Sequence, residues 1–319
     1  MLKKIAENIQ QNPHVIEKKD LTEIIQYIDK NSYTSKRIFS DIGEDSAAVK
    51  NGDKFLLMTT DRINTSFIEN FPFGAGFSSI LVGIDDIYCC GGTPLAASVI
   101  LSFNDRSKGQ KIIEGICEGS RKFHIPIIRG HTNANSQCYE LSTTLIGEIN
   151  KEDYISAKTA RVSDDIIIVS DFDGMVGKAS NLYWDTVTFK SSEDVLKKRK
   201  VMNVIAKQHL ANASKDISNG GIFGTILQLI KYSDVGANVN IEEIVLPKKL
   251  VELKYTLETY IKMYLTTSYI LTAQKKNSAQ VIKIINEYGL HANVIGSIIK
   301  EKNLLRINDG KESIDVIKF

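Results

Sequence analysis

Two apolar segments that follow residue 45 alternate with polar residues in the manner of β-strands. They cover residues 46–50 and 54–60, and the Asn-Gly dipeptide at 51–52 is typical of a tight hairpin turn. Because the strands of a hairpin run antiparallel, the start of the first lies beside the end of the second. The sequence therefore predicts that Asp45, at the entrance of the hairpin, lies next to Asp61, at its exit.

The chain before this hairpin has helical periodicity and many charges. After a possible N-cap at Asp20, apolar residues recur at the spacing of one helix face, at Leu21, Ile24, Ile25 and Ile28. We expect residues 1–40 to form a helical extension whose apolar stripe packs on the main body as a lid or flank.

A second helical pattern covers residues 77–88 and follows a loop predicted at 71–76. Its apolar stripe consists of Phe77, Ile80, Leu81, Ile84, Ile87 and Tyr88. At about 100° per residue, Asp86 falls almost opposite this stripe and Asp85 lies beside it. Asp86 is therefore free to face a cleft, although two acidic residues on a helix can also be an ordinary solvated face.

The remaining pattern divides the rest of the chain into two domains. Residues 41–152 are expected to form an α+β domain with an antiparallel or mixed sheet, with strands at 96–103, 125–128 and 139–148 and a helix at 107–122. Residues 153–319 are expected to form an α/β domain, with strands at 166–170, 264–273 and 294–299 and helices at 222–230 and 277–288. The basic run at 197–200 is interpreted as a solvated helix face.

Composition is that of an ordinary globular protein. Of the 319 residues, 43% are hydrophobic and 24% are charged, which suffices for a substantial core. The 40 basic and 38 acidic residues give a formal net charge of +2, which does not indicate a nucleic-acid or membrane partner. The four cysteines lack zinc-ligand spacing, and the N-terminus lacks the apolar core of a signal peptide. We expect a cytoplasmic protein with reduced thiols.

Carboxylates gather at the ends of the short segments between residues 41 and 86. Like charges a few ångströms apart raise one another's pKa values or require a counter-ion. Hard oxygen ligands suit Mg²⁺, which often bridges substrate phosphates. The chain has no Gly-x-x-x-x-Gly-Lys-Ser/Thr sequence, so an ordinary P-loop is excluded. The pattern therefore indicates a magnesium and nucleotide-phosphate site of another kind.

A glycine-rich segment at 214–221 leads into the helix predicted at 222–230. Backbone N–H groups at such a helix start can bind an anion, which makes Ser218 and Gly220 candidate phosphate contacts. An ordinary N-cap and turn is the alternative interpretation.

Five motifs in consistent order carry a family resemblance. They are Gly-Glu-Asp-Ser-Ala-Ala-Val at 43–49, Thr-Thr-Asp at 59–61, Asp-Asp-Ile-Tyr-Cys-Cys-Gly-Gly-Thr-Pro at 85–94, Arg-Gly-His-Thr at 129–132 and Lys-Asp-Ile-Ser-Asn-Gly-Gly at 215–221. Together they resemble the aminoimidazole ribonucleotide (AIR) synthase superfamily, which includes thiamine-monophosphate kinase, selenophosphate synthetase, the hydrogenase maturation factor HypE and formylglycinamidine synthetase. The Gly-His-Thr-Asn segment is most similar to the uncharacterised AIR synthase-related proteins.

The resemblance implies a two-domain PurM-like fold and a homodimer whose N-terminal domains pair into a β-barrel, with ATP and magnesium in clefts beside it. Carried onto matching positions, it implies the magnesium ligands Glu44, Asp45, Asp61, Asp86 and Asp216. The ATP contacts would be Glu44, Asp61, Gly130, Thr132, Asp216, Ser218 and Gly220. The catalytic residues would be Asp45, Asp86 and His131.

The resemblance also implies ATP-dependent phosphorylation of a small molecule, often at a carbonyl oxygen. Phosphoryl transfer needs positioning and charge neutralisation more than a covalent nucleophile, which agrees with a site rich in carboxylates. Two alternatives stay open, namely a non-catalytic nucleotide-binding dimeric scaffold and a thiamine-monophosphate kinase.

Two departures from the better-known relatives affect the predicted mechanism. Residues 266–268 read Thr-Thr-Ser, where thiamine-monophosphate kinases carry an acidic Gly-Gly-Glu-Asp-Tyr-Glu-type segment, which makes thiamine monophosphate a weak candidate substrate. His131 replaces an aspartate, so it removes a negative charge and changes the expected number of metals; it can carry a proton near pH 7 or merely hydrogen-bond its loop. The acceptor is not identified by the sequence.

Overall fold

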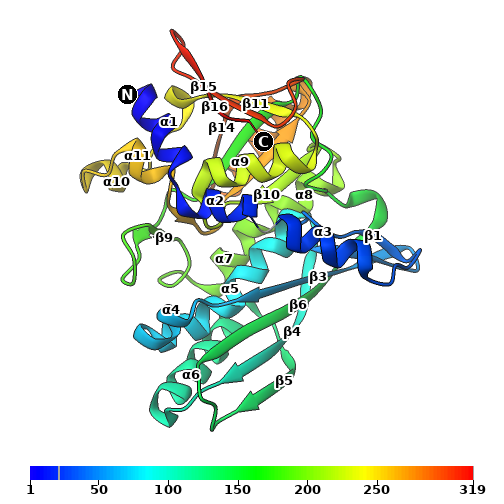
Figure 1. Cartoon of the computed structure of the whole chain (residues 1–319), viewed down its shortest axis with the longest axis vertical. Coiled ribbons are helices and arrows are strands. Elements are labelled where there is room, and N and C mark those ends of the chain that lie inside the picture. The colour runs from blue at the N-terminus through cyan, green and yellow to red at the C-terminus, as the bar shows by residue number, and fades with distance from the viewer. Residues whose placement is uncertain (21, 319) are drawn as a thin grey trace.

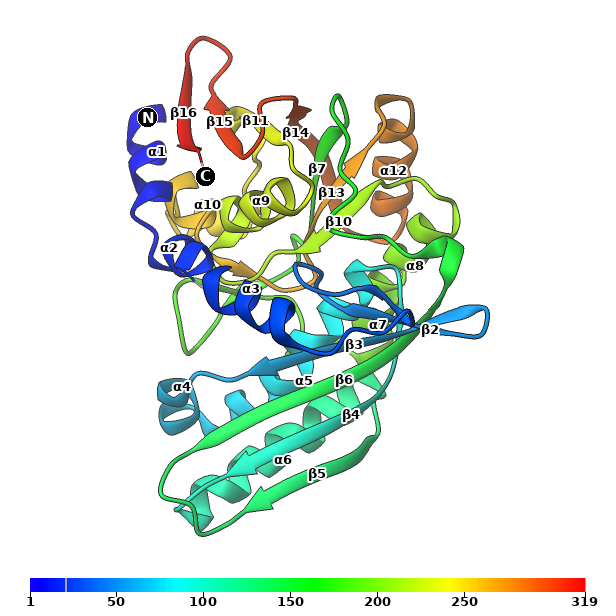
Figure 2. The same ribbon diagram turned by 45° about the vertical axis from the view of Figure 1, so that its right-hand side comes forward.

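The computed structural model describes residues 1–20 and 22–318 and has a two-domain α+β fold with a mixed sheet in each domain. In Figure 2 the first sheet lies in the lower half of the molecule and the second sheet in the upper half. Helix α5 (Pro72–Cys89) contacts strands of the first sheet and β10 of the second, so it joins the two domains. The end of this helix carries Asp85 and Asp86 to the junction.

The first sheet has the strand order β1-β2-β3-β6-β4-β5. Its neighbours are antiparallel except for β4 and β5, and the predicted hairpin is present, with Ala47 paired to Met58 across β2 and β3. The strands are β1 (Ile38–Ser40), β2 (Ala47–Asn51), β3 (Lys54–Arg62), β4 (Thr93–Ser102), β5 (Ile127–Asn133) and β6 (Glu140–Asn150), followed by a 3-10 turn η1 (Lys151–Asp153).

Helices α4 (Thr65–Asn70), α5 and α6 (Arg106–Phe123) cover one face of this sheet. The loop predicted at 71–76 is wrong, because α5 begins at Pro72, whose fixed φ suits the first helical position. The glycines that suggested a loop instead permit close helix packing. A Cβ on Gly76 would lie 2.1 Å from the carbonyl oxygen of Ile112, and one on Gly115 would lie 2.1 Å from that of Phe73.

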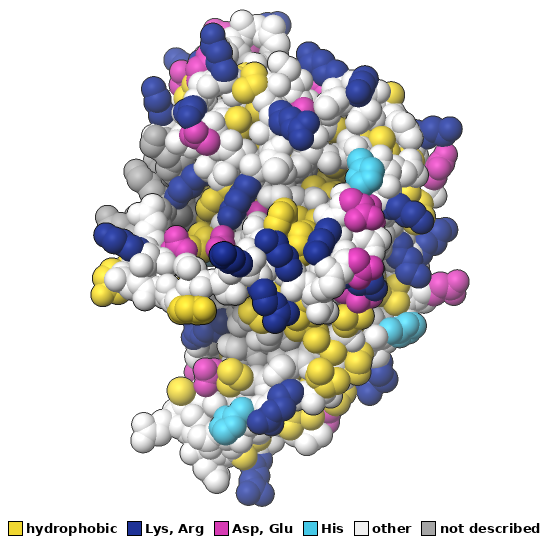
Figure 3. All heavy atoms as spheres, turned by 90° about the vertical axis from the view of Figure 1, so that its right-hand side faces the viewer, with side chains coloured by type: hydrophobic (Ala, Val, Ile, Leu, Met, Phe, Trp, Pro, Cys, Tyr) yellow, Lys and Arg dark blue, Asp and Glu magenta, His cyan; other side chains and the backbone are white. Residues whose placement is uncertain are grey.

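The other face of the first sheet carries exposed apolar side chains. Met58 and Ile100 are 47% and 44% exposed, whereas Phe55 and Leu57, which face the helices, are buried. Figure 3 shows hydrophobic side chains at the surface over the lower half of the molecule, the half that contains this sheet. The first domain is therefore a half-covered sheet in the single chain.

The second sheet has the order β10-β13-β7-β14-β11-β15-β16 and is mainly antiparallel, with β11 and β15 parallel. This corrects the α/β prediction for residues 153–319, since most strands are joined as antiparallel neighbours. The strands are β7 (Asp165–Ser170), β10 (Ala213–Asp216), β11 (Gly236–Asn240), β13 (Tyr269–Ala273), β14 (His291–Ile299), β15 (Leu304–Asn308) and β16 (Ser313–Lys318). The strand predicted at 264–273 is interrupted at Thr267, whose φ is 54°.

Both faces of the second sheet are buried. Ile167 and Val169 of β7 belong to the core shared with the first domain, whereas Ile166 and Ile168 belong to a core under α9 (Gly221–Tyr232). The other helices are α7 (Ser192–Arg199), α8 (Val201–Lys207), α10 (Lys248–Glu252), α11 (Leu257–Tyr260) and α12 (Lys275–Glu287), with a 3-10 turn η2 (Ile241–Glu243). A small sheet consists of β8 (Met175–Val176), β9 (Tyr183–Asp185) and β12 (Tyr264–Leu265).

The N-terminal extension forms α1 (Leu2–Gln10), α2 (Pro13–Asp20) and α3 (Thr22–Asn31). Helix α1 packs on the second domain through buried Leu2, Ile5, Ala6 and Ile9. The prediction that the stripe at 21–28 packs on the main body is wrong for Ile24 and Ile28 of α3, which are 60% and 57% exposed. Leu21 lies outside the described residues. The extension is thus anchored by its first turns, and α2 and α3 lead toward the first sheet (Figure 2).

Within the described part of the chain, the structure contains no helix long and apolar enough to cross a membrane.

Candidate functional site

Asp45, Asp86 and Asp216 come together at the junction of the two domains, and we call these residues the aspartate cluster. Each offers a carboxylate oxygen, and these oxygens all lie within 4.8 Å of one another. Asp45 lies in the turn before β2, Asp86 in the last turn of α5, and Asp216 at the end of β10. Three segments that are distant in sequence therefore contribute to one group of potential metal ligands.

Asp61 lies beside this cluster, as the hairpin register predicts. Ala47 pairs with Met58, which brings Asp45, two residues earlier, to the level of Thr60 and Asp61. The Asp61 Oδ2 atom is buried and has no hydrogen-bond partner among the described residues. Burial raises the pKa of Asp61, and the charge of Asp45 adds to this rise, whereas a hydrogen bond with Asp86 opposes it.

Asp86 faces the cluster because helix phase turns it away from the apolar stripe of α5. Thr59 donates a hydrogen bond of 2.5 Å from its Oγ1 to Asp86 Oδ2. Burial raises the pKa of Asp86 well above its usual value, and the nearby charges of Asp61, Asp216 and Asp45 raise it further. The site thus disfavours full ionisation of its carboxyl groups, a cost that a proton or a cation removes.

Asp45 has several hydrogen-bond donors supplied by the protein. Its Oδ1 forms an ion pair with the ammonium of Lys215, and its Oδ2 accepts hydrogen bonds from the Cys89 thiol at 2.9 Å and from the Asp216 N–H at 3.2 Å. Burial lowers the pKa of Lys215, but the charges of Asp45 and Asp216 outweigh this effect and raise it. Sequence reasoning missed Lys215, although a lysine directly before a predicted ligand in a short strand was a usable signal.

Asp85, next to Asp86 in α5, has a different environment. Arg199 of α7 donates two hydrogen bonds to its carboxylate, at 2.9 and 3.0 Å, and the Tyr269 hydroxyl donates a third at 3.0 Å. Arg199 is fully buried, so the prediction that residues 197–200 are a solvated helix face is wrong for this residue and for Lys198. Asp85 therefore fixes α5 to the second domain and is not a member of the aspartate cluster.

Glu44 points away from the cluster toward the interdomain linker. Its Oε1 accepts hydrogen bonds from the hydroxyls of Ser40 and Ser156, both at 2.5 Å, and its Oε2 accepts one from the Ala157 N–H at 2.7 Å. Through these hydrogen bonds, Glu44 fixes the turn before β2 to the start of the second domain. In this chain the structure does not bring it to the predicted metal site.

His131, Gly130 and Thr132 lie on β5, at the edge of the first sheet. The register joins Asp61 to Thr143, Thr143 to Val99, and Val99 to Gly130. Three strand spacings of about 4.8 Å separate the two ends of this row, so β5 lies roughly 14 Å from Asp61. His131 is the partner of Ile100, an exposed residue of the open face, so this face also carries the imidazole. Within one chain, these residues are therefore separate from the aspartate cluster.

Ser218 and Gly220 lie in the turn that connects Asp216 to α9. Gly220 and Gly221 have φ values of 97° and 64°, and the Ser218 carbonyl accepts a hydrogen bond from the Gly221 N–H at 3.0 Å. A Cβ on Gly221 would lie 2.1 Å from the carbonyl oxygen of Ile261. The glycines thus serve a tight turn that places the start of α9 next to the cluster.

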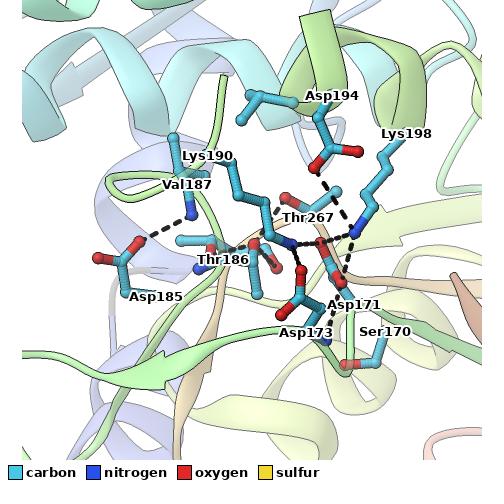
Figure 4. A network of polar contacts seen from close by, with 12 residues as sticks. Ser170, Asp171, Asp173, Asp185, Thr186, Val187, Lys190, Asp194, Lys198 and Thr267 are labelled. Atoms are coloured by element: carbon cyan, nitrogen blue, oxygen red, sulfur yellow. Dashed lines mark hydrogen bonds and ion pairs between the residues drawn. The ribbon is translucent and has the colours of Figure 1, made fainter. Parts of the chain in front are cut away.

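A buried network of lysines and hydroxyls adjoins Asp85 (Figure 4). Lys190 and Lys198 both contact the Asp171 carboxylate, at 2.7 and 2.9 Å. Thr186 exchanges hydrogen bonds with Thr266 and Thr267, and the Thr267 N–H donates to Asp85. Residues 266–268, which depart from the thiamine-monophosphate kinase pattern, are therefore buried structural residues.

Comparisons with known proteins agree with this architecture. The chain is 31% identical over 320 residues to the uncharacterized protein MJ0640 of Methanocaldococcus jannaschii, covering all of this chain and 97% of that protein. It is 22% identical to the thiamine-monophosphate kinase of Buchnera aphidicola, over 91% of this chain and 94% of the kinase.

Two solved structures have the same fold. AaThiL complexed with AMPPCP and TMP superposes with a TM-score of 0.67 at 20% identity, covering 92% of this chain and 95% of that one. Thermotoga maritima PurL complexed with ATP superposes with a TM-score of 0.72 at 14% identity, covering 88% of this chain and 47% of that longer one.

Family models cover most of the chain. Residues 43–149 match the N-terminal domain of AIR synthase related proteins, and residues 163–306 match their C-terminal domain. The chain therefore belongs to the AIR synthase related protein family, within the PurM-like superfamily.

Proposed function

We propose that this protein binds ATP with Mg²⁺ and uses them to phosphorylate a small molecule, acting as a kinase or as a ligase that activates a carbonyl or phosphate group. The observation that carries the proposal is the convergence of Asp45, Asp86 and Asp216, whose ligand oxygens lie within 4.8 Å of one another. A group of carboxylates at a domain junction is suited to hold a hard cation against substrate phosphates.

The chemistry of the donors fits Mg²⁺. Asp86 and Asp61 are half-buried, burial raises the pKa of each, and the buried Asp61 Oδ2 atom lacks a partner among the described residues. A divalent cation would supply the missing positive charge, and when bound it would neutralise charge on a transferring phosphoryl group. The cluster residues would hold the ion, and Asp61 would support it from the adjacent strand.

The nucleotide part of the proposal draws on the relatives. AaThiL and T. maritima PurL have been solved with AMPPCP and with ATP, and this chain shares their fold. The start of α9, with Ser218 and Gly220, lies next to Asp216, where backbone N–H groups would suit a phosphate. The phosphates would then lie between the cluster and this helix start.

We further propose that the protein acts as a homodimer. The open face of the first sheet exposes Met58 and Ile100, and a second copy laid on it would bury them. This pairing of sheets corresponds to the β-barrel expected from the sequence. It would also place β5, with His131, Gly130 and Thr132, near the partner copy.

Calorimetric titration with ATP, in the presence and absence of Mg²⁺, tests the proposal. Wild-type protein should bind ATP with Mg²⁺, and Asp45→Asn should lose this magnesium-dependent binding while keeping its fold. Asp53→Asn, at the exposed hairpin turn, is the matched control and should bind as wild type. An Asp45→Asn variant with unchanged affinity would remove the aspartate cluster from the function.

A non-catalytic nucleotide-binding scaffold is the second candidate. It is favoured by residues 266–268, which are Thr, Thr and Ser, are buried, and therefore offer no acidic side chain for catalysis. Release of ADP with a panel of small carbonyl and phosphate compounds separates the two. Tight binding of ATP without turnover of any compound would favour the scaffold.

A further inference from the structure

Lys215 places a positive charge inside the site where a metal is expected. Its ammonium pairs with Asp45 Oδ1, and the side chains of Lys215 and Asp45 are 5% and 7% exposed. Lys215 precedes Asp216 in β10, whose other residues are also buried. A lysine in a buried strand costs desolvation free energy unless its charge is paired, and the Asp45 carboxylate together with the nearby charge of Asp216 offsets that cost for Lys215.

The geometry makes Lys215 a competitor for the same oxygen that a cation would use. Asp45 contributes one ligand oxygen to the aspartate cluster, while its Oδ2 is already engaged by Cys89 and by the Asp216 N–H. A divalent ion that binds Asp45 through Oδ1, the oxygen that these two donors leave open, therefore competes with the Lys215 ammonium for it. The released ammonium would stay within the site, because its strand is fixed by pairing to β13.

We propose that Lys215 is a built-in counter-ion of the aspartate cluster, which occupies the Asp45 position in the metal-free protein and is displaced from Asp45 Oδ1 when a divalent cation binds. This inference rests on the metal part of the proposed function. It has two consequences: the metal-free site is partly neutralised by the chain itself, and the affinity for a free divalent ion is lower than the carboxylates alone would give.

The first experiment measures Mn²⁺ binding without nucleotide, by electron paramagnetic resonance of the free ion. Lys215→Met should bind Mn²⁺ about tenfold more tightly than wild type, since the competitor is gone; this factor corresponds to about 1.4 kcal/mol, which lies within the range for coupled residues in contact. Lys54→Met, which breaks the half-exposed pair with Glu148, is the matched control and should leave the affinity unchanged. Equal or weaker binding by Lys215→Met would overturn the proposal.

A double-mutant cycle separates competition for Asp45 from general electrostatics. In an Asp45→Asn background, whose weakened Mn²⁺ binding is measured at higher ion concentration, Lys215→Met should change the Mn²⁺ affinity by less than about threefold, because the contested carboxylate is absent. An equal gain in both backgrounds would show that Lys215 acts only through its overall charge, and would also overturn the proposal.

Wild-type protein provides a measurement that does not depend on the folding of a variant. Addition of Mg²⁺ should shift the side-chain NMR signals of Lys215 and leave those of Lys54 in place. A Lys215 signal that stays fixed at saturating Mg²⁺ contradicts displacement. If wild-type protein binds neither Mg²⁺ nor Mn²⁺, the metal part of the proposed function fails, which is a different result from bound metal with an undisturbed Lys215.

Discussion

Arg199 and Asp85 form a buried bidentate ion pair, with N–O distances of 2.9 and 3.0 Å, across the boundary between the two domains. Asp85 is one residue from Asp86, so the pair fixes the rotation of α5 that turns Asp86 toward the aspartate cluster. Arg199 also lies over the ring of Phe123, 5.2 Å from its centroid. A structural ion pair thus determines the direction of a carboxylate of the aspartate cluster.

Replacing Arg199 with methionine should destabilise the protein strongly. The change leaves the Asp85 carboxylate buried without its main counter-ion, and loss of one partner of a buried pair costs about 3–5 kcal/mol. Urea denaturation followed by circular dichroism measures the difference. Lys197→Ala, at an exposed position of the same helix, should change stability little; a similar small effect for Arg199→Met would contradict a structural role for the pair.

The pKa of Asp86, raised by burial and by three neighbouring carboxylates, predicts how stability depends on pH. A carboxyl group whose pKa is higher in the folded than in the unfolded state takes up a proton on folding. The metal-free protein should therefore be stabilised at pH values below 3.8 and lose that stability as the pH rises through the raised pKa. Asp86→Asn, which is neutral at every pH, should reduce this loss.

Thermal melting of metal-free protein between pH 4 and pH 8 measures this effect. At pH 7, Asp86→Asn should melt higher than wild type by about 2 °C for each kcal/mol of relieved repulsion. The variant should lose the additional stabilisation that Mg²⁺ gives to wild type. Identical pH profiles for the two proteins would show that Asp86 does not carry the unfavourable charge.

Glu44 and Asp216 should respond differently to loss of charge. Glu44 accepts hydrogen bonds from Ser40, Ser156 and the Ala157 N–H, so Glu44→Gln should lower stability, by about 1–3 kcal/mol, and leave Mn²⁺ affinity near that of wild type. Asp216→Asn should keep most of the stability and lose Mn²⁺ binding. Calorimetry with Mn²⁺ measures the metal affinity of both variants, and urea denaturation measures their stability. Loss of metal binding in Glu44→Gln would show that Glu44 is a metal ligand.

The open sheet face should control the oligomeric state. Ile100→Glu places a charge on the open sheet face, which also exposes the apolar Met58, so it should convert a dimer to a monomer in analytical ultracentrifugation. Val251→Glu, on α10 at another exposed apolar position, is the control and should not affect association. A wild-type protein that sediments as a monomer at all concentrations would contradict the dimer.

Much of the first domain and part of the site follow from local sequence signals. The Asn-Gly turn predicted the hairpin register and therefore that Asp61 lies beside Asp45. Helix periodicity predicted that Asp86 faces away from the apolar stripe and that Asp85 lies beside it. The local pattern could not show that a charged side chain is buried when its partner lies far away in the sequence. Lys215 pairs with a residue 170 positions away, and Arg199 pairs with one 114 positions away, so neither ion pair could be predicted from neighbouring residues.

The helix start at Pro72 shows a second limit of sequence reasoning. Phe-Pro-Phe-Gly-Ala-Gly suggests a loop from composition alone, yet Gly76 is required where α5 crosses α6 at close range. The role of Gly76 therefore depends on a helix more than thirty residues later in the chain, and no local pattern records that crossing. In the same way, the resemblance grouped His131 with the aspartates, whereas sheet order places it at a distant edge.

The aspartate cluster takes two members from the first domain and one from the second, which makes its ligand spacing a measure of interdomain orientation. A rotation of the domains that moved β10 by 2 Å relative to α5, roughly the order seen in domain rearrangements, would separate Asp216 from Asp86 beyond the reach of one ion. If the proposed function holds, a cation bound by the aspartate cluster would link the two domains. Conversely, a ligand that tilts one domain against the other would change the spacing of these three carboxylates.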